Sequence, residues 1–219
     1  TPDLSASTLS HFCWLLTHQL YVSSMESLNR VVPRFYELPH PTRTSLIEGE
    51  RRFLSETPML DYSTVVVAFA KAVEICLAQV IFAPYKSICD ASVNISQQIE
   101  TAKKDKKSQA SSLFTFLERG QHLELGSMAH LLRLCNGRTA EKEHLIGALR
   151  NFIREELNGA TFLDNENVEA IGLIAKEFRN PGAHSDVLTK DNSEECRRLC
   201  IDVLKSLEPC IAEYVQGDS

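Results

Sequence analysis

The chain has 219 residues, of which 43% are hydrophobic and 24% are charged, and it carries a formal net charge of −6. This composition is typical of a globular protein that buries a substantial core as one large domain or two small ones. The negative charge excludes a broadly basic, nucleic-acid-coating surface, because neutralising phosphates needs clustered Lys and Arg. Any contact with nucleic acid therefore has to be local.

The first residues of the chain and its cysteines predict the cellular compartment. The chain opens on Thr1 without Met or a basic and apolar leader, which predicts a piece of a larger, non-secreted protein. Its seven cysteines show no CxxC spacing, so we expect reduced core thiols in a cytoplasmic protein. The apolar stretch 65–83 is interrupted by Lys71, Glu74 and Gln79, which favours a core helix and predicts no membrane partner.

The first 60 residues read as an extension of the main domain. Apolar residues recur at helical spacing from Ser7 to Val31 and predict an N-terminal helix. Prolines then break the chain at positions 33, 39, 41 and 58, which leaves room for only a short helix over 45–54. We therefore expect residues 1–60 to be an N-terminal helix and a proline-rich connector, and residues 61–219 to be the main domain.

The main domain is predicted to be entirely helical. Ser63 is a good N-cap residue, and the wide apolar stripe from Val66 to Ile81 predicts a long core helix. A weaker helix over 88–98 and a polar loop over 101–112 follow. Further helices are expected over 123–135, 140–157, 165–178 and 193–214, the last kinked by Pro209. No strand pattern or internal repeat is visible, so the predicted fold class is an all-α helical bundle with an N-terminal helical extension.

The helix over 165–178 leads into Arg179-Asn-Pro-Gly-Ala-His184. Asn180 can cap a new helical turn whose first residue is Pro181, so that His184 lies one turn in. A guanidinium binds phosphate oxygens as a fork, and an imidazole exchanges protons near neutral pH, so Arg179 and His184 could form a ribonuclease pair. The structural alternative is that Arg179 caps carbonyls at a helix end while His184 fills a polar junction.

Spacing alone does not select this pair. Arg34 and His40 flank the proline-broken connector, and Arg138 and His144 fall on different sides of a helix start. Neither pair has the helix-junction setting, so context singles out Arg179 and His184.

The motif between two late helices of a bundle resembles the Arg, polar residue, His motif of the HEPN superfamily. Ser63-Thr-Val-Val-Val-Ala-Phe-Ala-Lys-Ala-Val-Glu74 looks like the opening core helix of bacterial HEPN-like domains, and Leu123-Glu-Leu-Gly-Ser-Met-Ala-His-Leu-Leu132 looks like a segment that often precedes their motif. The resemblance covers roughly residues 60–215. The Pro181-Gly182 pair inside the motif is a departure from the family pattern.

The resemblance implies a domain that commonly dimerises and places two Arg-His motifs in one cleft that cuts RNA without metal or cofactor. His184 would handle the proton of the attacking 2′-hydroxyl or of the leaving group, Arg179 would stabilise the phosphate, and Asn180 would orient one of them. The family also contains inactive binding and toxin-neutralising members. A prokaryotic defence or toxin-antitoxin role is implied in the same way.

Two further groups complete the candidate residues. Glu74 and Lys71, one turn apart, could support the Arg-His pair from the first core helix, or form an ordinary surface salt bridge. Four lysines could guide a nucleic-acid strand, or lie in a solvated loop: Lys103, Lys104, Lys106 and Lys107. Cys196 and Cys200 match the core stripe and have no second ligand pair, so no metal site is expected.

These patterns favour a metal-independent endoribonuclease or RNA-sensing effector domain, acting as a homodimer within a larger protein. The alternative is a non-catalytic module for dimerisation or protein interaction, which the acidic composition and the Pro181-Gly182 departure favour.

Overall fold

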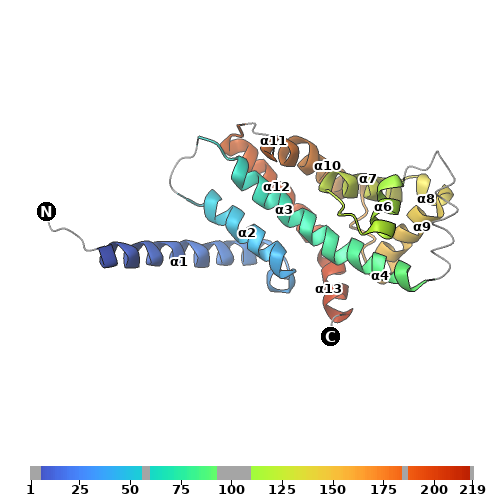
Figure 1. Cartoon of the computed structure of the whole chain (residues 1–219), viewed down its shortest axis with the longest axis horizontal. Helices are drawn as coiled ribbons and strands as arrows, with labels where there is room; N and C mark the ends of the chain where they lie inside the picture. The colour runs from blue at the N-terminus through green and yellow to red at the C-terminus, as the bar shows by residue number, and fades with distance from the viewer. Residues whose placement is uncertain (1–5, 56–59, 93–109, 184–186, 218–219) are drawn as a thin grey trace.

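The computed structural model describes residues 6–55, 60–92, 110–183 and 187–217, and these residues form helices and connecting loops with no strand (Figure 1). The predicted all-α bundle is confirmed. The helices surround a single hydrophobic core whose central element is the long helix that begins at Ser63.

That central helix runs without a break through α3 (Ser63–Leu77), the π-helical stretch η2 (Ala78–Phe82) and α4 (Ala83–Ala91). The predicted interruption before residue 88 is wrong. Pro84 has no backbone N–H to donate within an α-helix, and its ring would crowd the carbonyl four residues back. In the wider turn of η2 the Ala83 N–H bonds to the Ala78 oxygen five residues back, and this carries the helix past Pro84.

The apolar character of this helix follows from its position. Val65, Phe69, Val73 and Cys76 are fully buried among the other helices. Among the described residues, one helix, spanning 63–91, is long and apolar enough to cross a membrane, and 61% of its most apolar window is buried inside the protein. The prediction of a core helix is therefore confirmed by its packing.

The N-terminal segment also contributes to the core. α1 (Ala6–Val31) is followed by η1 (Phe35–Glu37) and α2 (His40–Phe53). α2 is longer than predicted, because Pro39 precedes it and Pro41 lies in its first turn, where a missing N–H costs nothing. Leu28, Phe35 and Leu46 are buried in the same cluster as α3.

α2 lies directly against α3 and fixes α1 to the body. A Cβ at Gly49 would come within 3.2 Å of the Phe69 ring, so glycine permits this close approach. At the next position in α2, the fully buried carboxylate of Glu50 accepts hydrogen bonds from the Arg197 guanidinium of α12 (Lys190–Ser206), at 2.6 and 2.7 Å, and from the Ser27 hydroxyl of α1, at 2.7 Å. This one side chain joins three helices.

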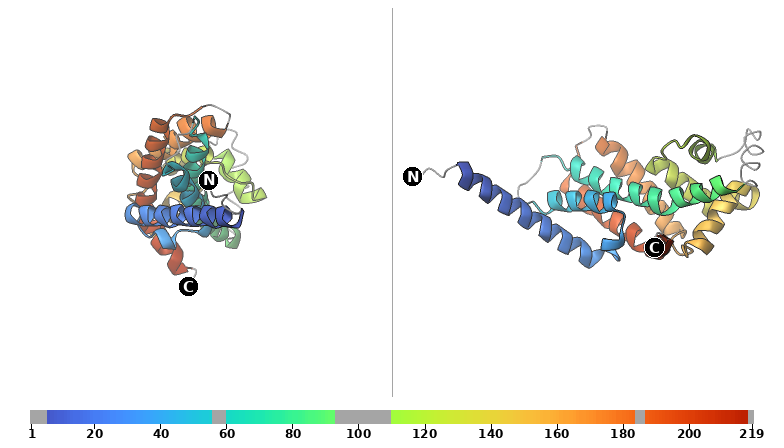
Figure 2. Two further views of the ribbon diagram at one scale, coloured as in Figure 1. Left: turned by 90° about the vertical axis from the view of Figure 1, so that its left-hand side faces the viewer. Right: turned by 60° about the horizontal axis from the view of Figure 1, so that its bottom comes forward.

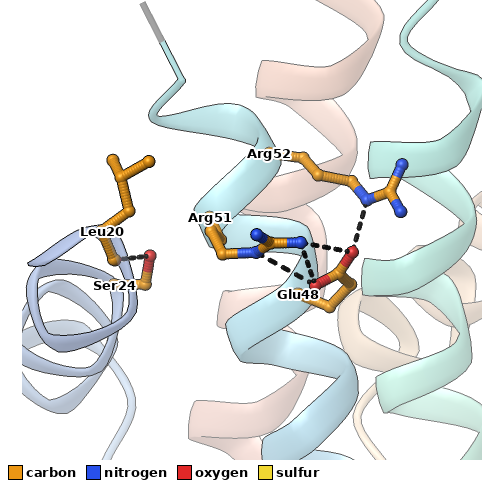
Figure 3. A network of polar contacts seen from close by, with 5 residues as sticks. All are labelled: Leu20, Ser24, Glu48, Arg51 and Arg52. Carbon is orange, nitrogen blue, oxygen red and sulfur yellow. Dashed lines mark hydrogen bonds and ion pairs between the residues drawn. The ribbon is translucent and has the colours of Figure 1, made fainter. Parts of the chain in front are cut away.

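On the solvent-facing side of α2, a glutamate pairs with two arginines of the same helix (Figure 3). Glu48 accepts hydrogen bonds from Arg51 at 3.0 Å and from Arg52 at 2.6 Å, and all three side chains are about two-fifths exposed. Pairs of this kind within one helix contribute a few tenths of a kcal/mol each. The N-terminal part of α1 extends past α2 and away from the body (Figures 1 and 2).

The remaining helices pack around the other sides of α3 and α4. They are α6 (Ser111–Arg119), α7 (Leu125–Asn136), α8 (Thr139–Lys142), α9 (His144–Asn151), η3 (Phe152–Glu156), α10 (Asn165–Leu173), η4 (Ile174–Arg179), α11 (Asn180–Ala183), α12 and α13 (Glu208–Gly217). α10 packs between α7 and α12, and α12 packs on α3.

Three sequence expectations in this half are wrong. The single helix expected over 140–157 is divided at Glu143, whose backbone is extended, into α8 and α9. Ser111 and Ser112 belong to α6 rather than to a polar loop, and α6 ends at Gly120, whose φ of 62° suits glycine. The single helix expected over 193–214 is divided at Leu207 into α12 and α13, because Pro209 occupies the first turn of a new helix instead of kinking an old one.

Candidate functional site

The Arg179 motif lies in a continuous helical segment. α10, η4 and α11 follow one another without a loop, and Asn180 has helical backbone angles (φ −69°, ψ −51°). The prediction that Asn180 caps a new helix is therefore wrong. As at Pro84, the turn before Pro181 is π-helical: the Asn180 N–H bonds to the Ala175 oxygen five residues back.

Gly182 of the Arg179 motif has a packing role. A Cβ at Gly182 would come within 3.1 Å of Val67 and 3.5 Å of the Ser63 carbonyl, so α11 lies close against the start of α3. On the other side of residues 184–186, the Leu188 N–H donates to the Asp61 carboxylate at 3.1 Å, just before α3. Both flanks of this part of the motif are thus held at the N-terminal end of α3. His184 itself lies outside the described residues.

Glu74 of α3 is the residue at which the candidate site comes together. Its side chain is 12% exposed, and its Oε2 atom accepts the Leu125 N–H at 3.1 Å and lies 3.6 Å from Nε of Arg179. Its Oε1 atom lies 3.3 Å from Nε2 of His122. Since Leu125 is the first residue of α7, the carboxylate also sits at the positive end of that helix.

Three distant chain segments therefore meet at one carboxylate. The Glu74–Arg179 pair is at ion-pair rather than hydrogen-bond distance, and the Arg179 side chain is 27% exposed. Nη1 of Arg179 contacts the Asn180 side-chain oxygen at 3.5 Å, the outer limit of a hydrogen bond. A guanidinium has five N–H donors. Arg179 therefore keeps donors for an incoming anion while Glu74 holds its Nε side.

A small polar pocket adjoins the cluster on the side of His122. Its volume is 220 Å³, and three of its wall residues carry hydroxyl groups. It is lined by Ser112 and Thr115 of α6, by Gln121, His122, Leu123 and Glu124 of the following loop, and by Ser127 of α7. Two larger hollows, of 850 and 690 Å³, lie elsewhere and include none of the predicted site residues.

The other predicted residues do not join this arrangement. Lys71 lies one turn before Glu74 and is exposed, and it forms no ion pair with Glu74 or with any other described residue. Lys103, Lys104, Lys106 and Lys107 lie outside the described residues, in the segment that joins α4 to α6.

Metal-ligand geometry is also absent from the described part of the chain. No group of three or more His, Cys, Asp or Glu side chains is placed to hold an ion there. Cys196 and Cys200, with sulfurs 3.9 Å apart, are fully buried in the core between α12 and α3.

His122 is the residue that sequence reasoning missed. It is 48 positions from its partner Glu74 in the chain, and neither spacing nor helical periodicity connects the two. The available signal was Glu74 itself, because a carboxylate in an otherwise apolar helix needs partners from elsewhere.

No family model, curated protein or solved structure matches the chain. The interpretation of the site therefore depends on its own geometry and on the resemblance of its motif.

Proposed function

We propose that the chain is a metal-independent endoribonuclease or RNA-sensing effector domain of the HEPN type, with Arg179 as its phosphate-binding residue. The observation that carries the proposal is the placement of Arg179: its guanidinium is fixed on one side by the nearly buried Glu74 and partly open on the other. An oriented guanidinium costs less to immobilise on binding phosphate than a free one.

In this proposal each motif residue has one task. Arg179 stabilises the negative charge of the phosphate, Asn180 orients Arg179 from the adjacent position, and His184 transfers the proton of the 2′-hydroxyl or of the leaving oxygen. Glu74 is a positioning residue, because it contacts Arg179 rather than the RNA. The four lysines between α4 and α6 would attract the strand, and their contribution would weaken as salt rises.

We further propose that the domain acts as a homodimer in the cytoplasm of a prokaryote, within a larger protein of a defence or toxin-antitoxin system. This follows from the resemblance of the motif alone.

The test is cleavage of mixed single-stranded RNA in EDTA, with products resolved on a gel. We expect cleavage by the wild-type protein and at least 100-fold slower cleavage by Arg179→Ala and His184→Ala, since each removes a group that acts in the transition state. Arg133→Ala is the control, because Arg133 also pairs with a glutamate, Glu169, but on the exposed surface of α7 and α10 and away from the candidate site. Equal rates for all folded variants would refute the proposal.

A second candidate is a non-catalytic dimerisation or interaction module. It is favoured by α1, which extends beyond the body (Figure 2). The Tyr21 and Val22 side chains of this helix are 44% and 40% exposed. If the chain is such a module, the double variant Tyr21→Ser, Val22→Ser should weaken self-association in sedimentation experiments. No variant should then cut RNA.

A further inference from the structure

His122 has an orientation that Glu74 determines. An ionised carboxylate can only accept hydrogen bonds, so the contact from Nε2 of His122 to Oε1 of Glu74 at 3.3 Å places the ring proton on Nε2. In the neutral ring, Nδ1 is then the acceptor. A histidine whose one nitrogen is held by a carboxylate, with the other nitrogen available, has the arrangement of a general base.

The carboxylate that contacts this histidine is itself held by other groups, although the ring is exposed. The His122 side chain is 64% exposed, whereas Glu74 is 12% exposed and is also held by the Leu125 N–H and Arg179. The exposed ring can thus meet a large ligand, while its direction is set from the protein interior.

The adjoining pocket favours a sugar over a free anion. Ser112, Thr115 and Ser127 line it, and hydroxyl side chains of this kind can hydrogen-bond sugar hydroxyls; the Thr115 hydroxyl, which donates to the Ser111 carbonyl at 3.0 Å, can only accept. Glu124 in the same wall would repel a phosphate. Its volume of 220 Å³ is below that of sites for drug-sized ligands, which start near about 300 Å³, and suits one sugar ring.

We propose that His122, oriented by Glu74, is a second catalytic residue of the Arg179 site and acts as the general base toward an RNA ribose seated in this pocket. The inference rests on the proposed ribonuclease function. Nδ1 of His122 takes the proton of the 2′-hydroxyl, the 2′-oxygen forms a bond to phosphorus, and the bond from phosphorus to the 5′-oxygen breaks. The 5′-oxygen leaves with a proton from water, and Arg179, held by the other oxygen of Glu74, would stabilise the charge that builds on the phosphate.

The first test compares His122→Gln with His130→Gln, a matched control because His130 is also exposed, on the adjacent helix α7. General-base catalysis contributes about 10²–10⁴-fold to a rate. We expect His122→Gln to lower kcat by at least 100-fold, to remove the fall of kcat toward acid pH, and to change the affinity for a 2′-deoxy analogue by less than threefold. His130→Gln should cleave like the wild type.

The carboxylates beside His122 need their own variants. Glu74→Gln should lower kcat because it releases the ring, whereas Glu124→Gln should keep the acid limb of the pH profile. If Glu124→Gln loses that limb and His122→Gln keeps it, Glu124 is the base and our assignment is wrong. Cleavage by His122→Gln at the wild-type rate, while Arg179→Ala is inactive, would overturn the inference and leave the proposed function standing.

A second measurement is independent of cleavage. In nitrogen-15 NMR spectra of the intact protein at neutral pH, His122 should carry its proton on Nε2, and adenosine 3′-monophosphate should shift its ring signals more than those of His130. If no RNA is cut, such a shift still supports the site, whereas an unresponsive ring without a fixed tautomer removes it.

Discussion

The ion pair between Glu50 and Arg197 gives the sharpest test of how the helices are held together. The perturbation is Arg197→Ala. It removes a guanidinium that donates two hydrogen bonds, at 2.6 and 2.7 Å, to a carboxylate with no exposed surface. The Ser27 hydroxyl, at 2.7 Å, remains the partner of Glu50. One neutral donor cannot compensate a buried negative charge.

Breaking a buried pair from one side costs about 3–5 kcal/mol, and loss of the contact between the Arg197 guanidinium and the Phe53 ring, 5.4 Å apart, adds about 0.5–1 kcal/mol. Glu50→Ala should cost less, about 1.5–3 kcal/mol, because the Arg197 side chain is 21% exposed and can reach water. Replacing both residues, as Glu50→Leu with Arg197→Met, should be milder than Arg197→Ala, since no charge is left buried.

Urea unfolding followed by circular dichroism measures these differences as changes in the free energy of unfolding. The control is Arg198→Ala, whose 58%-exposed side chain pairs with Glu195 and Asp202 on the surface of the same helix and should cost at most about 1 kcal/mol. If Arg197→Ala and Arg198→Ala destabilise the protein equally, the argument from burial is wrong.

Two further predictions concern pH and thiol chemistry. Hydrogen bonds from the Ser63 hydroxyl, the Ser63 N–H and the Leu188 N–H hold the pKa of Asp61 below its usual value of 3.8. Since the folded pKa is lowered, this stabilisation is present above pH 3.8 and is lost as pH falls through the folded pKa, so Asp61→Asn should flatten the loss of thermal stability in acid, whereas parallel melting curves would argue against it. Burial raises the pKa of Cys76, Cys135 and Cys210 to about 12; these thiols should therefore react with Ellman's reagent only after unfolding, and fast reaction of the native protein would contradict their burial.

The positions of the core helices could be predicted from periodicity, because each has one or more sides to bury. The apolar residues from Val66 to Ile81 recur at helical spacing and all lie on buried or partly buried positions of one helix. The helix boundaries near proline were predicted less well. Pro41 was expected to break the chain and Pro181 to begin a new helix, and the core helix was traced only to Ile81, before Pro84. Pro41 instead lies in a first turn, and the helix continues through the π-helical turns that precede Pro84 and Pro181. A wider turn has no signature in hydrophobic periodicity.

The candidate site shows the same division between local and distant information. Arg179 and Glu74 were predicted from the sequence, the first by its motif and the second, together with Lys71, as a charged pair one turn apart on the first core helix. Lys71 was grouped with Glu74 by its spacing, but its side chain is exposed, whereas Glu74 contacts the start of α7 and Arg179 of η4. Spacing along one helix identifies neighbours on that helix; it does not identify what packs against them.

Glu74 links the two proposed roles within the site, phosphate binding by Arg179 and proton transfer by His122. Its two oxygens divide their partners: Oε1 faces His122, and Oε2 faces Arg179 and the start of α7. A phosphate that binds Arg179 brings negative charge toward Glu74, and a proton taken up by His122 from the 2′-hydroxyl places positive charge on the other side of the same carboxylate. In the proposed mechanism, the developing imidazolium would thus offset the repulsion between phosphate and Glu74 as the reaction proceeds. Glu74 would therefore oppose phosphate binding in the ground state more than it opposes the transition state. Such an arrangement favours catalysis over passive RNA binding.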